Sequence, residues 1–357
     1  DQIINVPVAA STGYDSRFIN AGEIQNQGVE IMLNASPIQN DNGFSWSFNI
    51  NYGQNTSEVV SLTEGINNYQ LASDMYPADG GADLSFEARE GKEFGQLVGK
   101  GLKRVEDGQY EGEIIHEDGL PVETDEKVSA GSYQPDFRLG VSNTLSYKNL
   151  SLNFLIDGQV GGQIYSRTHT MLATGGAITN EDDEDIGKTL EGRGDYTPQY
   201  VEKDGEVVVE KDDQGNPVYV ENEAPTGYTG DGVKNVGTEE NPEYVPNDVT
   251  VPTRDYFYQY YGNGFNRDIV TTGTYDATFF KLREVTLTYQ FPDSWFKNNI
   301  VQDAAFSLVG RNLVLWTQVP SIDPETYSIR NGRIIQGYES TQLPSTRSYG
   351  FNISVKF

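Results

Sequence analysis

Aromatic side chains are concentrated in one short stretch of this chain, where they could bind a ligand by stacking. The run Tyr256-Phe257-Tyr258-Gln259-Tyr260-Tyr261 holds five aromatic residues, and Phe265 follows shortly after it. Aromatic rings stack on sugars and pack against peptides or protein partners, so these residues are candidates for contact with a ligand or a lid protein. They could also form an aromatic girdle or pack against one another, and the sequence leaves these alternatives open.

Carboxylates gather in a second stretch. Residues 181–250 hold 20 Asp and Glu against 5 Lys and Arg, and so carry 15 of the 28 net negative charges. The densest part, Glu181 to Asp185, could ligate calcium, a hard cation that prefers carboxylate oxygens. However, the regular spacing of an EF-hand loop is absent, and the stretch has no sustained apolar period. We therefore predict a solvated acidic excursion, with structural calcium as the alternative.

The other polar candidates form no catalytic or metal-binding pattern. His116 and His169 lie in different predicted loops without a ligand-spaced companion, so a zinc site is not expected. Arg311 and the segment Asp323-Pro324-Glu325 are expected near one rim, in structural ion pairs around a loop. The sequence has no nucleophile elbow, phosphate-binding loop or HExxH motif. No catalytic residue and no metal ligand is predicted, and the chain is not expected to be an enzyme.

The elements that carry these loops are strands, because apolar and polar residues alternate with a period of two. In 277–291 the apolar residues switch from even to odd positions near Arg283 and Glu284. This change of phase indicates a β-bulge or a strand whose upper part has left the membrane. The predicted strands are Ile3–Val8 (weakened by Pro7), 29–35, 44–53, 137–147, 150–160, 277–291, 304–316 and 347–357.

The polar faces of these strands are made of Ser, Thr, Asn, Gly and Gln with few charges, which suits a water-filled interior. Only 36% of the residues are hydrophobic and no long apolar run occurs, which excludes membrane helices. We therefore predict an all-β fold, an antiparallel transmembrane β-barrel segment. A β-sandwich would also alternate, but with more Lys and Glu on its outer faces. The net charge of −28 argues against binding to nucleic acid.

The lengths of the connections divide the loops into two groups. Short turns are predicted at 37–43 and 148–149, whereas about 58–134, 166–273 and 317–346 are long. In outer-membrane barrels short turns are periplasmic and long loops extracellular, and strand parity places every long segment on one side. The chain opens without a signal peptide and its last strand runs to Phe357, so we expect a piece of a longer protein.

Several motifs, in order along the chain, resemble the SusC/RagA family of TonB-linked outer-membrane proteins. The matching segments are Asn20-Ala-Gly-Glu-Ile-Gln-Asn-Gln-Gly-Val-Glu30, Phe44-Ser-Trp46, Gln134-Pro-Asp-Phe137, Gly161-Gly-Gln-Ile-Tyr165, Phe279-Phe-Lys-Leu-Arg-Glu-Val-Thr-Leu-Thr-Tyr289, Gly310-Arg-Asn-Leu313, Asp323-Pro-Glu325 and the terminal strand. Family members are far longer, so the resemblance covers residues 1–357 as the C-terminal portion of the barrel. It implies about the last eight strands of a 22-stranded barrel.

The resemblance also implies a function and partners. Such proteins are multi-pass proteins of the bacterial outer membrane that import oligosaccharides or oligopeptides. A SusD-like lipoprotein caps them, and TonB drives them through the plug. The expected partners are therefore that lipoprotein, the remaining N-terminal barrel and plug part, TonB through that part, the cargo and outer-membrane lipids. A self-contained barrel or adhesin, or a secreted glycan-binding sandwich, remains as an alternative.

Overall fold

The structure, a computed structural model, describes most of the chain. The described residues are 2–7, 16–63, 66–72, 84–175, 196–198, 200–203, 206–209, 211, 219–221, 228–238, 241–262, 269–297, 300–330 and 333–357.

One antiparallel sheet dominates the described residues. It contains eight strands in the spatial order β1-β2-β3-β10-β11-β20-β21-β25, so each strand pairs with its neighbours in chain order within the sheet. The strands are β1 (Gln2–Pro7), β2 (Ser16–Gln39), β3 (Phe44–Leu62), β10 (Phe137–Tyr147), β11 (Leu150–Val160), β20 (Phe279–Gln290), β21 (Asp303–Thr317) and β25 (Ser348–Lys356).

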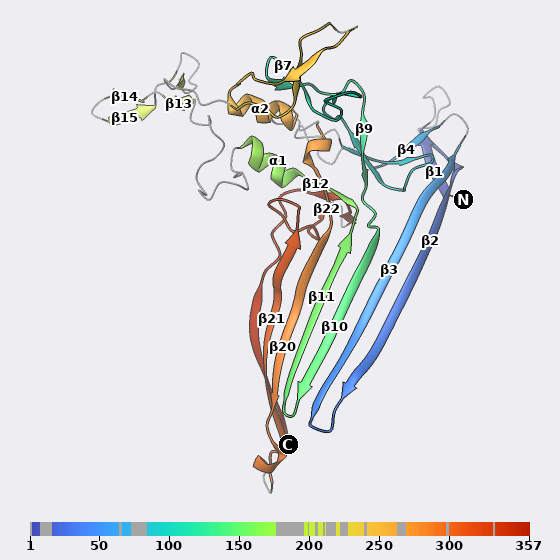
Figure 1. Cartoon of the computed structure of the whole chain (residues 1–357), viewed down its shortest axis with the longest axis vertical. Helices are drawn as coiled ribbons and strands as arrows, with labels where there is room; N and C mark the ends of the chain where they lie inside the picture. Colours follow the sequence, from blue (N-terminus) through green and yellow to red (C-terminus); the bar gives the residue numbers. More distant parts are fainter. Residues whose placement is uncertain are drawn as a thin grey trace.

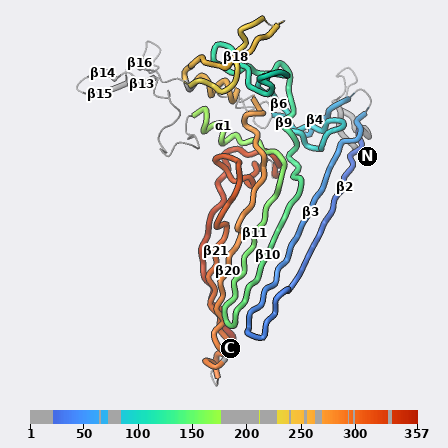
Figure 2. Tube along the Cα trace, in the orientation of Figure 1, coloured from blue at the N-terminus to red at the C-terminus, as the bar shows by residue number. Residues whose placement is uncertain are grey.

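Short and long connections lie at opposite ends of this sheet (Figure 1). The β10–β11 turn has two residues, Lys148 and Asn149, and Lys148 adopts the positive φ of 52° that such a tight hairpin needs. The neighbouring β2–β3 turn is also short, and the Lys148 amide donates to the Gly43 carbonyl at 3.0 Å. The long segments between β3 and β10, β11 and β20, and β21 and β25 all leave from the other end, as the tube in Figure 2 also shows.

The sheet has one apolar and one polar face, as the alternation predicts. Leu33, Ile50 and Val141 pair in one row of the apolar face, and Asn34, Asn49 and Ser142 form the next row on the polar face. Large side chains of the apolar face remain uncovered: Leu33 is 48% exposed and Phe351 is 70% exposed. Among the described residues no second sheet packs on this face, which is the arrangement of a wall that faces lipid.

A bulge at Arg283 interrupts the regular register of β20. On β11 the partners of Leu155 and Ile156 are Glu284 and Leu282, so Arg283 is an extra residue. The pairing with β21 skips at the same place. This extra residue resets the alternation, which explains the phase flip and confirms the predicted β-bulge. It also leaves Lys281 and Arg283 on the polar side of the sheet, where both make ion pairs.

β2 and β3 extend well beyond the segments that alternation identified. On the apolar side of β2, Val29 and Ile31 are followed towards the loop end by Gln27 and Gln25. Their partners on β3 change in the same way, from Tyr52 and Gln54 to Thr56 and Glu58. The strands therefore continue past the apolar band, with polar side chains replacing the apolar ones on that face.

The long connections fold into a lobe of short elements above the sheet (Figure 1). These elements are β4 (Asn68–Ala72), β5 (Ser85–Arg89), β6 (Gln96–Gly99), β7 (Ile115–Glu117), β8 (Leu120–Pro121), β9 (Val128–Ser132), β12 (Gln163–Ser166), α1 (Arg167–Thr174), β17 (Val233–Asn235), β18 (Tyr244–Pro246), α2 (Thr253–Tyr260), η3 (Thr271–Gly273), β19 (Thr274–Asp276), β22 (Ser328–Arg330), β23 (Arg333–Ile335) and β24 (Tyr338–Glu339). Two further pairs, β13 (Tyr196–Pro198) with β16 (Tyr219–Glu221) and β14 (Tyr200–Lys203) with β15 (Glu206–Val209), form separate two-stranded sheets. The turn between β20 and β21, at the opposite end, contains η4 (Asp293–Trp295).

This lobe holds most of the buried apolar side chains of the described residues. One cluster includes Leu97, Tyr165 and Tyr338, which come from three different long connections. The same connections also pair as strands, because β12 lies between β19 and β24, and β17 pairs with β7. Val233 of β17 is 1% exposed, so at this position the segment 181–250 packs into the lobe.

Candidate functional site

The aromatic run forms α2, and its side chains point largely into the lobe. Tyr256, Phe257 and Tyr261 are buried in a cluster with Ala173 of α1. Their rings contact one another, with centroids 5.3 Å apart for Tyr256 and Phe257 and 6.4 Å apart for Phe257 and Tyr261. Tyr228 packs on the same cluster, 4.7 Å from the ring of Tyr256. The cluster thus ties α1 to α2 through aromatic packing.

Two buried histidines attach α2 to the other long connections. His116 stacks on Tyr256 at 5.9 Å, and its Nε2 lies 3.3 Å from the Tyr256 hydroxyl. His169 of α1 lies between the Tyr261 hydroxyl at 3.4 Å from Nε2 and the Ser321 hydroxyl at 3.1 Å from Nδ1. Burial lowers the pKa of His169 to about 4, and burial also lowers the pKa of His116, so both rings are neutral at pH 7.

Burial also determines the ionisation state of the tyrosines of α2. It raises the pKa of Tyr256, Tyr260 and Tyr261, so none of these hydroxyls ionises near neutral pH. Tyr258 and Tyr260 are half-buried and keep some exposed surface, whereas Phe265 lies outside the described residues. The structure therefore brings four of the six candidate aromatics into one cluster, namely Tyr256, Phe257, Tyr260 and Tyr261. Tyr258 and Tyr260 are the described candidates that keep exposed surface for contact with a ligand or a lid protein.

A cavity of about 710 Å³ lies on the polar face of the sheet, towards the loop end. Its floor is a row of paired positions across β2, β3 and β10, namely Glu30, Gly53 and Arg138. The 318–347 connection contributes Glu325 and Tyr327 to the lining. The cavity thus lies between the strand wall and a long connection that folds over it.

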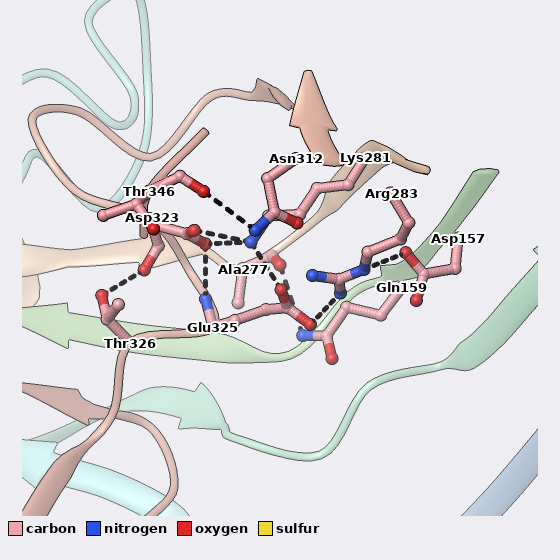
Figure 3. A network of polar contacts seen from close by, with 10 residues as sticks. All are labelled: Asp157, Gln159, Ala277, Lys281, Arg283, Asn312, Asp323, Glu325, Thr326 and Thr346. Carbon is pink, nitrogen blue, oxygen red and sulfur yellow. Dashed lines mark hydrogen bonds and ion pairs between the residues drawn. The ribbon is translucent and has the colours of Figure 1, made fainter. Parts of the chain in front are cut away.

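An ion-pair network holds this connection against the wall (Figure 3). The Lys281 ammonium donates to both carboxylate oxygens of Asp323, at 2.7 and 2.6 Å, and it also pairs with Glu325. Arg283 pairs with the same Glu325 and, at 2.6 Å, with Asp157 of β11. The side chains of Lys281 and Asp323 are only 2% and 4% exposed, so this pair is shielded from water.

The charged state of the two loop carboxylates follows from these contacts. Burial alone would raise the pKa of Asp323, but hydrogen bonds from Lys281 and Ser345 hold it below its usual value. Burial opposes ionisation of Glu325 in the same way, and hydrogen bonds from Arg283 and Lys281 outweigh it and lower its pKa. Both carboxylates are therefore ionised at pH 7.

The side chains predicted to form ion pairs at the rim do so in the structure, but with partners that the sequence did not identify. Arg311 pairs with Glu284 at 2.8 Å, and Asp323 and Glu325 pair with Lys281 and Arg283. The phase flip in 277–291 was the available signal, because a bulge in the middle of a strand marks a position where side chains are re-aimed.

The described residues contain no group of three or more His, Asp or Glu side chains that could hold a metal ion. The candidate calcium cluster at 181–185 lies outside the described residues.

Within the described part of the chain, no helix is both long and apolar enough to cross a membrane.

Curated proteins similar to this chain are TonB-dependent receptors. TonB-dependent receptor P26 of Formosa agariphila is 27% identical over 377 residues, which cover all of this chain and 31% of that receptor. TonB-dependent receptor SusC of Bacteroides thetaiotaomicron is 23% identical over 223 residues, 56% of this chain and 21% of SusC. This chain thus spans about a third or less of the relatives it matches. No family model matches it.

Solved structures share the fold. The RagAB peptide transporter matches 99% of this chain and 32% of that chain, with a TM-score of 0.56 and 19% identity. The RagAB peptide importer in its closed-closed state matches all of this chain and 32% of that chain, with a TM-score of 0.58 and 20% identity.

Fold and relatives together show a segment of an antiparallel β-sheet wall that resembles the barrels of the TonB-dependent receptor class. Within that class, the resemblance to the SusC/RagA type that the motifs predicted is confirmed by the matches to SusC and to RagAB. The relatives are named as receptors and importers, not enzymes, in agreement with the expectation for this chain.

Proposed function

We propose that this chain is the C-terminal part of an outer-membrane active transporter that imports oligosaccharides or oligopeptides. The observation that carries the proposal is a strand wall with an uncovered apolar face, a polar opposite face and a lobe of long connections at one end only. A lipid-facing side, a wet lumen and a one-sided loop lobe are what a transport barrel needs. The receptors and importers that resemble the chain support the same function and an outer-membrane location, with strands crossing the membrane several times.

The open edges of the sheet support a larger assembly. Among the described residues, β1 and β25 each pair with one strand of the sheet, and in lipid an unpaired edge strand is costly because its backbone groups lack hydrogen bonds. We propose that the remaining N-terminal barrel strands of a 22-stranded barrel pair with these edges and that a plug fills part of the lumen. TonB acts on that part, and outer-membrane lipids cover the apolar face.

We further propose a SusD-like lipoprotein as the lid over the loop lobe. The half-buried rings of Tyr260, which packs against the aromatic cluster, and of Tyr258 on the same helix suit contact with such a lid or with cargo.

The two alternative classes fit the geometry less well. A secreted sandwich needs a second sheet over the apolar face, and the described residues provide none. A self-contained eight-stranded barrel needs β1 to pair with β25, whereas in the part of the chain that the structure describes these strands are the two edges of the sheet.

Uptake by the full-length protein tests the proposal. The gene and its lipoprotein partner are expressed in a Bacteroidetes host, and uptake of labelled oligosaccharide and oligopeptide mixtures is measured with and without functional TonB. We expect uptake of one of these cargo classes and its loss without TonB. Uptake that is unchanged without TonB, or absent for both classes, would overturn the proposal.

A further inference from the structure

The floor of the cavity on the polar face includes glycines where a side chain would have room. A Cβ atom added at Gly53 would meet nothing within 4 Å, and at Gly140 the nearest atom would be the Asp157 Cβ at 3.9 Å. The backbone of Gly53 does not have the positive φ that glycine alone favours. The residue is thus not needed for conformation, and its effect is to open space between β2 and β10.

Opposite charges flank this gap. Glu30 and Arg138 are the residues paired on either side of Gly53, and both are exposed on the cavity side of their strands. Neither makes an ion pair with any residue that the structure describes, whereas the lining carboxylates Asp157 and Glu325 are both occupied by Arg283. The cavity therefore offers one available carboxylate and one available guanidinium.

The distance between the two charges, and their position along the strand wall, suit a small cargo. Two strand spacings separate their backbones by about 10 Å. Arg138 is the second residue of β10, so the pair lies at the end of the wall where the long connections leave. The Tyr327 ring, near enough to Arg138 to feel its charge, adds an aromatic surface to the lining.

We infer that this cavity is a cargo subsite for a zwitterionic ligand, with a short oligopeptide bearing free ends as its simplest form. Arg138 binds the ligand carboxylate through charge-assisted hydrogen bonds, and Glu30 binds its ammonium group. An extended tripeptide spans about 10 Å, which matches the separation of the two strands. A neutral oligosaccharide would gain little from two free opposite charges. The inference deepens the proposed function and rests on it, since it names the cargo that the lumen recognises.

Binding of defined probes to the purified full-length protein with its lipoprotein tests this subsite. The probes are trialanine, N-acetyl-trialanine, trialanine amide, the doubly blocked peptide and maltotriose, titrated by calorimetry. We expect trialanine to bind best and the loss of either terminal charge to weaken binding about tenfold, as one charge-assisted contact is removed. Arg138→Gln should abolish only the preference for the free carboxylate, and Glu30→Gln only the preference for the free ammonium.

A pair of glycine variants separates occupancy of the cavity from folding. Gly53→Trp fills the floor and should abolish trialanine binding. Gly350→Trp, at another polar-face position where an added Cβ meets nothing within 4 Å, should leave binding unchanged.

The outcomes distinguish this inference from the proposed function. Equal affinity of the wild-type protein for trialanine and its blocked forms would overturn the subsite. So would a loss of folded protein in Glu30→Gln or Arg138→Gln without a change in ligand preference, because the two charges would then serve contacts within the barrel, such as those with a plug. Failure of TonB-dependent uptake would instead contradict the proposed function, since the binding assay does not require TonB.

Discussion

Lys281 shows how a single residue fixes a long connection. Its ammonium group is almost fully buried and lies between two carboxylates of the 318–347 connection. A buried pair of this kind adds little net stability over an apolar replacement, but removal of one partner leaves an unpaired charge away from water. Lys281 therefore determines where the connection lies more than how stable the strand wall is.

Substitution of Lys281 tests this role. In the full-length protein, Lys281→Met should cost about 3–5 kcal/mol in the local stability of the 318–347 connection, because Asp323 is left buried and unpaired. Hydrogen-exchange mass spectrometry should show loss of protection in residues 318–347. The control is Lys103→Met, whose partner Asp125 is 87% exposed and whose loss should cost at most about 1 kcal/mol. Equal protection in both variants would contradict the role assigned to Lys281.

At the scale of elements, α2 links the three long connections to one another. It lies in the connection between β11 and β20 and reaches His116 in the connection between β3 and β10. Through His169 it is also linked to Ser321, in the connection between β21 and β25. All three long connections thus meet at the two histidines, and both of these rings are held neutral by burial.

This arrangement predicts that the lobe weakens in acid. The pKa of His169 is about 4 in the folded lobe and 6.5 when exposed, so the unfolded lobe binds more protons between these values. The contribution of His169 to the free energy of unfolding of the lobe is fully present above pH 6.5. It falls as the pH approaches 4, by up to about 3 kcal/mol. Protection factors of α2 amides, measured by hydrogen exchange between pH 4 and 7.5, should fall accordingly.

His169→Gln provides the comparison, since the amide keeps a neutral hydrogen-bonding group without a titrating ring. Its pH profile should be flatter than that of the wild-type protein, with the remaining slope due to other groups such as His116, Asp323 and Glu325. If the two profiles coincide, His169 does not set the acid sensitivity of the lobe.

At the scale of the whole molecule, apolar burial is divided between two environments. The loop lobe buries its own apolar clusters, whereas the strand wall leaves large apolar side chains uncovered on one face. In a bilayer this face is solvated by lipid chains, so the wall needs no protein layer over it.

Two positions on opposite faces of β3 test this division. Ile50 lies on the apolar face, in the row with Leu33 and Val141, and Ser47 lies on the polar face, opposite Thr144. Ile50→Arg should destabilise the membrane-inserted full-length protein by about 2–4 kcal/mol, whereas Ser47→Arg should have a small effect because its side chain reaches water in the lumen. Folded yield in the outer membrane and unfolding from phospholipid vesicles measure both. Similar losses for the two variants would contradict the assignment of the faces.

The sequence by itself determined the strand wall, because side-chain alternation is a local property with a period of two. It located the core of each of the eight strands, assigned their faces and predicted the bulge at Arg283. It underestimated β2, which begins at Ser16, since Phe18, Ile19 and Ile24 do not keep one alternation with Val29 and Ile31.

Only the tertiary structure decided the contacts within the loop lobe and the network below it. The residues that meet there are far apart in the chain: His116 and Tyr256 are separated by 140 positions, and Lys281 and Asp323 by 42. No local period encodes such pairs, so neither the burial of Tyr256 and Tyr261 nor the partner of Lys281 could be read from spacing. These contacts form because the wall brings the three long connections to the same end, where their apolar and charged side chains are buried against one another.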